Sequence, residues 1–161
     1  MIADWNDFFL AQAGAFAALT GLVFVALSIN LKEILDQPGL PGRAGEAVIV
    51  LVLPVLIGVL GLIPHQDERT LGAELLVVAV AAWATVSAIL FTARHSMRAR
   101  PNPEVAIRIV LVQTATLLVV TAAAFLMTGA TSGLYWQAAG TGVCLMVGMT
   151  DAWVLLIEIL R

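Results

Sequence analysis

Long apolar stretches separated by short polar ones dominate this chain. The longest stretch without a charge runs from Ile109 to Thr150, about twice the ~20 residues that an α-helix needs to cross a bilayer core. Its middle, residues 128–133, is rich in Gly, Thr and Ser, which favour turns. The pattern therefore predicts two membrane helices joined by a tight turn, at 109–128 and 134–157.

The remaining apolar stretches predict three more membrane helices, at residues 8–31, 46–63 and 71–93. Polar segments at 32–45 and 94–108 form the two substantial loops, and the Pro-Gly pairs at 38–39 and 41–42 predict successive turns in the first of them. Pro54 predicts a kink inside the second helix. The expected fold is all-α: one transmembrane domain over residues 1–161, a polytopic protein with five helices.

Composition supports a membrane protein and excludes a soluble one. Of the 161 residues, 61% are apolar and only 12% are charged, which is more apolar surface than a water-soluble domain of this size could bury. The first apolar stretch follows Asp4 and Asp7 and has no basic residue before it, so we expect it to remain as a helix and not to be cleaved as a signal peptide.

The basic residues predict how the chain is oriented. With five spans, an external N-terminus and a cytoplasmic C-terminus, seven of the eight Lys and Arg residues lie on the cytoplasmic side and only Arg69 lies outside. Cytoplasmic loops of membrane proteins carry such an excess of positive charge. We therefore expect a multi-pass protein with its N-terminus outside.

Two helices carry small residues along one face. In the first helix these include Gly14, Ala18 and Gly21, and in the fifth they are Gly140, Cys144 and Gly148, each series in steps of three and four. In lipid, small residues let helix backbones approach closely. We expect these stripes to pack helices together and to support a homo-oligomer.

Asp151 is the strongest candidate for a functional residue, because an ionisable side chain inside a membrane span is costly. Arg108, Glu46, Gln113 and Asn30 are predicted to lie near the same cytoplasmic-side depth. One interpretation of this polar cluster is a proton- or cation-handling site, and the other is an Arg108–Asp151 tie that fixes two helices together.

Other polar positions have two interpretations each. Thr114, Thr121 and Thr128 share one helix face, where they could line a wet path or bond back to their own helix. The loop residues Arg43, Arg94, Arg98 and Arg100 could bind anionic lipid or an acidic partner, or could serve only to set the topology.

No residue pattern predicts catalysis or a cofactor. His65 and His95 are expected on opposite sides of the membrane, and Cys144 is the single cysteine, so we expect no metal site. No phosphate-loop, dinucleotide or nucleophile-elbow motif occurs in the sequence, and the net charge of −3 gives no reason to expect a nucleic-acid partner.

The first quarter of the chain resembles a family of small, uncharacterised bacterial membrane proteins, some of which carry the automatic label "modulator of FtsH protease". The resemblance rests on residues 4–9 (DWNDFF), 14–25 (GAFAALTGLVFV), 28–31 (SINL) and 38–43 (PGLPGR). It implies a location in the bacterial inner membrane and partnership with a membrane-bound protease.

Two functions are therefore expected from the sequence. The first is a non-enzymatic inner-membrane protein that self-associates and acts as an accessory or regulatory subunit, with a membrane protein as its partner. The alternative is a homo-oligomeric ion channel, or a transporter of protons or small ions, with an acidic site on the cytoplasmic side.

Overall fold

The fold consists of helices joined by short turns. A computed structural model describes residues 2–37, 39–96 and 103–155 and contains a short 3-10 helix followed by six α-helices: η1 (Ile2–Trp5), α1 (Asn6–Ile29), α2 (Leu31–Asp36), α3 (Leu40–Gly61), α4 (Glu68–Ser96), α5 (Pro103–Met127) and α6 (Gly133–Trp153). No strand occurs within these described residues. The prediction of an all-α fold is confirmed.

The segment predicted as a loop at residues 32–45 is largely helical, and that part of the prediction is wrong. Gly39 adopts a φ of +92°, which suits glycine, and it ends the turn between α2 and α3. Pro41 then lies in the first turn of α3, where its missing N–H costs nothing because the first amides of a helix have no partner within it. As a result Arg43 and Glu46 are both helical residues, three positions apart on α3.

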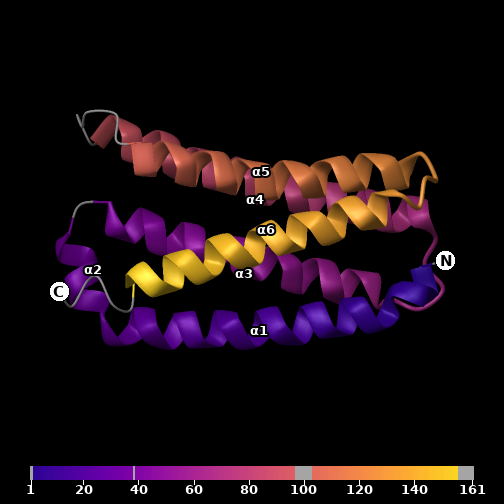
Figure 1. The fold of residues 1–161 in the computed structure, drawn as a ribbon, viewed down its shortest axis with the longest axis horizontal. Coiled ribbons are helices and arrows are strands. Elements are labelled where there is room, and N and C mark those ends of the chain that lie inside the picture. Colours follow the sequence, from indigo (N-terminus) through magenta and orange to yellow (C-terminus); the bar gives the residue numbers. More distant parts are fainter. Residues whose placement is uncertain (1, 38, 97–102, 156–161) are drawn as a thin grey trace.

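The helices form an elongated bundle with α6 in its middle (Figure 1). α1 packs beside α3, and α4 packs beside α5. α6 runs between these two pairs and contacts both α3 and α5 along its length. The start of α1 and the end of α6 lie at opposite ends of the bundle (Figure 1).

Four of the described helices are long and apolar enough to cross a membrane: α1, α3, residues 68–92 of α4 and residues 106–127 of α5. This is consistent with a multi-pass membrane protein. The described part of α6 ends at Trp153 and carries three polar side chains, Gln137, Thr141 and Asp151. All three side chains are buried inside the bundle.

Glycines let α6 approach its neighbours closely. A Cβ on Gly133 would lie only 2.6 Å from the carbonyl oxygen of Ala122 on α5, and one on Gly148 would overlap the side chain of Leu51 on α3. Gly140 also faces α5, and Cys144 is fully buried. The predicted stripe of α6 therefore packs within the chain, so it is not free to bind a second copy.

The stripe on α1 has the opposite environment. Ala11, Gly14, Ala18 and Gly21 are all exposed, and no described atom lies within 4 Å of the position that a Cβ on either glycine would take. The face of α1 that packs onto the bundle is a different one, marked by Phe9, Phe16 and Val23. The small-residue stripe of α1 therefore points away from its own chain.

Candidate functional site

Four charged side chains from three helices meet at the end of the bundle where α3 and α5 begin. Arg43 donates from Nε to Asp151 Oδ1 at 2.9 Å. Arg108 donates from Nη2 to Glu46 Oε2 at 2.5 Å, and its Nε lies 3.3 Å from Asp151 Oδ1. We call these residues the ion-pair cluster: Arg43 and Glu46 on α3, Arg108 on α5 and Asp151 on α6.

The carboxylates of this cluster are buried and its arginines reach outward. The side chains of Glu46 and Asp151 are each only 1% exposed, whereas those of Arg43 and Arg108 are 22% and 24% exposed. Two positive and two negative charges balance when all four groups are ionised. A charge removed from water is tolerated when it is paired and hydrogen-bonded in this way, and long arginine side chains can carry their charge toward a polar boundary.

The pairing leaves several polar atoms unused. Glu46 Oε1 and Asp151 Oδ2 are buried and have no hydrogen-bond partner among the described residues. The N–H of Arg108 Nε also lacks one, because its close approach to Asp151 does not have hydrogen-bonding geometry. Buried polar atoms of native proteins nearly always have a partner, and ordered water commonly supplies it. This cluster therefore has the chemistry to hold water or to accept a proton.

The structure brings together most of the residues that the sequence suggested. Glu46, Arg108 and Asp151 meet as expected, and the Asn30 amide donates to the Leu155 carbonyl at the same end of the bundle, at 3.5 Å. Gln113 instead donates to Ser87 Oγ at 3.1 Å, between α5 and α4. Gln113 thus belongs to a separate contact.

The role expected for Arg43 changes. The sequence pattern places it in a loop, where it could bind anionic lipid or an acidic partner or serve only to set the topology. In the structure it lies on α3, and its Nε donates to Asp151. A sequence signal existed, since residues three apart share a helix face, but it required α3 to begin before Arg43. The remaining loop arginines, Arg98 and Arg100, and the side chain of Arg94 lie outside the described part of the chain.

A second buried polar cluster, made of uncharged groups, lies nearer the opposite end. Gln12 on α1 donates from Nε2 to the Pro54 carbonyl oxygen on α3 at 2.7 Å. Its Oε1 accepts from Gln137 Nε2 at 2.9 Å and from Thr141 Oγ1 at 3.1 Å, both on α6. We call Gln12, Gln137 and Thr141 the amide cluster. It links α1, α3 and α6 through neutral hydrogen bonds.

The amide cluster is buried, and the sequence did not reveal it. All three side chains are buried, and Gln137 Oε1 has no hydrogen-bond partner among the described residues. The spacing of Gln137, Thr141 and Asp151 does follow the steps of four and three that keep residues on one helix face. That spacing alone could not identify Gln12, which is 125 positions away from Gln137.

The three threonines on one face of α5 hydrogen-bond within their own helix. Thr114 donates to the Val110 carbonyl at 2.7 Å, Thr121 to the Leu117 carbonyl at 2.8 Å, and Thr128 to the Phe125 carbonyl at 2.6 Å. Each hydroxyl thus bonds back to its own helix, which is the second of the two expected arrangements.

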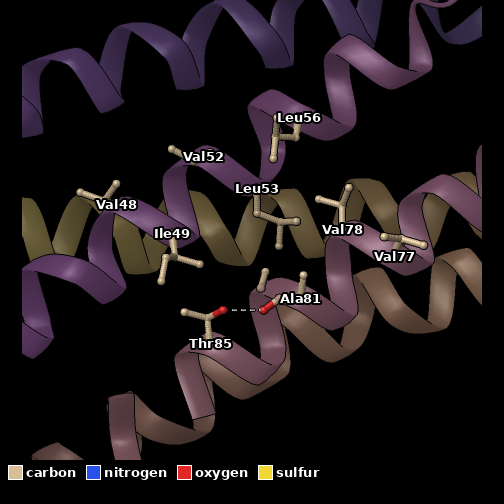
Figure 2. A pocket seen from close by; sticks show the side chains of 10 residues that line it. Val48, Ile49, Val52, Leu53, Leu56, Val77, Val78, Ala81 and Thr85 are labelled. Carbon is tan, nitrogen blue, oxygen red and sulfur yellow. Dashed lines mark hydrogen bonds between the residues drawn. The ribbon is translucent and has the colours of Figure 1, made fainter. Parts of the chain in front are cut away.

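An apolar groove of about 380 Å³ lies between α3 and α4 (Figure 2). Valine, leucine, isoleucine and alanine side chains line it, together with Thr85. The Thr85 hydroxyl donates to the Ala81 carbonyl of its own helix at 2.8 Å, as the dashed line in Figure 2 marks. No ionisable side chain lines the groove, so it adds no charged group to the two clusters.

Comparisons with known proteins do not identify the chain. No protein-family model, no curated protein and no solved structure matches it. No group of three or more His, Cys, Asp or Glu residues is placed to hold a metal ion within the described residues. The functional argument therefore rests on the geometry of the two clusters and on the exposed face of α1.

Proposed function

We propose that this protein is a non-enzymatic integral protein of the bacterial inner membrane that self-associates through α1 and acts as an accessory or regulatory subunit of a membrane complex. The observation that carries the proposal is the open face of Gly14 and Gly21. Exposed glycines gain nothing from contact with lipid, but they allow a second helix to approach closely.

The contrast with other glycines supports this proposal. Gly58 and Gly61 on α3 contact α1, Gly72 on α4 contacts α5, and the α6 glycines at 133, 140 and 148 each face a neighbouring helix. Most glycines in the long helices of this chain thus lie at a contact between two helices. The same use of glycine on the exposed face of α1 favours a partner helix there, and a second copy of α1 is the simplest one.

The proposed arrangement in the membrane has five spans, with α6 as the fifth, an external N-terminus and a cytoplasmic C-terminus. The burial of Gln137, Thr141 and Asp151 supports α6 as a span, because polar side chains inside a bundle do not meet lipid. This arrangement places the ion-pair cluster near the cytoplasmic boundary.

The proposed partner is a membrane-bound protease complex, on the resemblance of residues 4–43 to the family described above. Since Arg43 is engaged within the chain, the open stripe of α1 is the surface that we assign to partner helices as well as to self-association.

Gly21→Leu tests self-association. The added side chain would hold two α1 helices apart, and we expect the oligomer to dissociate in mild detergent, as measured by light scattering coupled to size-exclusion chromatography. Gly142→Leu on α6 is the matched control, because that glycine also has open space around it but lies outside the stripe. An unchanged mass for Gly21→Leu would contradict the proposed interface.

A further inference from the structure

We propose that α1, α3 and α6 enclose a route for protons within a single copy of the chain, running from the amide cluster to the ion-pair cluster and closed in this structure by Leu51 packed on Gly148. This is a second activity, independent of self-association. It is carried by two buried polar clusters on the same face of α6 and by the contact of Leu51 with Gly148 between them.

The two clusters are aligned along α6. Gln137 and Thr141 belong to one cluster and Asp151 to the other, and Cys144 and Gly148 continue the same face between them in steps of three and four. All of these residues are buried. Ten residues of helix separate Thr141 from Asp151, or about 15 Å at a rise of ~1.5 Å per residue. That distance is too long for a direct hydrogen bond, so a chain of water molecules is needed.

Each end of this route has oxygen atoms that can bind such water. Gln137 Oε1 is available in the amide cluster, and Glu46 Oε1 and Asp151 Oδ2 are available in the ion-pair cluster. All three atoms are buried and lack a hydrogen-bond partner among the described residues, although their side chains are held in place by other bonds. Polar atoms with this environment are the usual ligands of buried water.

Leu51 lies between the two clusters, at the level of Gly148. Leu51 on α3 fills the space that a side chain at position 148 would otherwise occupy. Because Gly148 contributes no side chain, shortening Leu51 removes the group that fills this space. An apolar constriction of this kind excludes water and blocks ion passage until it widens.

The chemistry assigned to the route is proton transfer along water. At the cytoplasmic-side end, the free oxygen of Glu46 or Asp151 accepts the proton, while Arg43 and Arg108 remain charged and hold the carboxylates in position. The neutral amides hydrogen-bond to water without changing their own protonation. The arginines, as fixed positive charges, disfavour metal cations at the same end.

The test compares Leu51→Ser with Leu53→Ser in purified protein reconstituted in liposomes. Leu51 and Leu53 lie on the same helix and are 1% and 2% exposed, but Leu53 lines the apolar groove between α3 and α4 (Figure 2). A potassium diffusion potential with valinomycin drives protons, and an enclosed pH-sensitive dye reports their flux. We expect flux that is severalfold higher for Leu51→Ser than for Leu53→Ser and wild type.

A further substitution separates a specific route from a loosened bundle. Adding Gln137→Leu to Leu51→Ser removes the water-binding amide and should return the flux to that of Leu53→Ser. Equal flux from Leu51→Ser and Leu53→Ser would overturn the proposal, as would flux that Gln137→Leu does not reduce.

Cys144 provides a second measurement that does not depend on flux, and it also serves if Leu51→Ser does not fold. It is the only cysteine of the chain and is fully buried on the route between Thr141 and Gly148. With the milder Leu51→Ala, we expect a small water-soluble thiol reagent to label Cys144 faster than in Leu53→Ala. Equal labelling rates in the two variants would overturn the proposal.

Discussion

The ion-pair cluster and the amide cluster bury polar groups on the same face of α6, yet they do so in different ways. The ion-pair cluster balances full charges and keeps its two arginines partly exposed at one end of the bundle. The amide cluster contains only neutral groups, and all three of its side chains are buried. In a membrane, a charge must stay within reach of a polar boundary, whereas amides and hydroxyls can be buried once they bond to one another.

This difference predicts unequal sensitivity to substitution. Removing one member of a charged cluster leaves a buried charge without its partner, and removing one member of a neutral cluster leaves at most an unsatisfied dipole. We therefore expect the free energy of unfolding to fall more when a residue of the ion-pair cluster is replaced than when a residue of the amide cluster is replaced.

The largest effect is expected for Arg108→Ala, because Arg108 contacts both Glu46 and Asp151. The substitution leaves Glu46 buried without the arginine that pairs with it, and we expect the free energy of unfolding to fall by about 3–5 kcal/mol. Reversible unfolding in mixed detergent micelles, followed by circular dichroism, measures the change. Arg69→Ala, at an exposed position near the start of α4, is the control and should cost less than about 0.5 kcal/mol.

A double substitution tests whether the loss comes from the unpaired carboxylate. Glu46→Leu combined with Arg108→Met removes both members of one pair and leaves Arg43 with Asp151. Replacing a whole buried pair by apolar side chains is often close to neutral, so we expect the double variant to recover most of the stability lost in Arg108→Ala. If it were as unstable as Arg108→Ala, the packing of the arginine and not its charge would be responsible.

Smaller effects are expected in the amide cluster, and they should differ within it. Gln12→Leu removes three hydrogen bonds to two other helices, and we expect a loss of about 1–2 kcal/mol. Gln137→Leu should cost only about 0.5 kcal/mol, because Gln12 keeps its bonds to Pro54 and Thr141 and an unpaired oxygen is removed. The same unfolding assay compares the two variants. If Gln137→Leu lowered the free energy of unfolding as much as Arg108→Ala does, the expectation that charged clusters are the more sensitive to substitution would be contradicted.

The sequence by itself determined the class of the protein and the order of its helices. Long uncharged stretches have few stable alternatives to membrane helices, because backbone groups in lipid must be satisfied within the segment. Helix ends were less well determined: the sequence suggested turns across residues 32–45, whereas α3 begins at Leu40 and has Pro41 in its first turn.

Only the tertiary structure decided which helix faces meet. Periodicity placed small residues on one face of α1 and on one face of α6, but it could not say that Gly148 packs on Leu51 while Gly14 and Gly21 stay open. It likewise placed Asp151 on a buried face without revealing Arg43 as its partner, 108 positions away. A helical pattern describes one element at a time, and the pairing of distant elements depends on how all of them pack together.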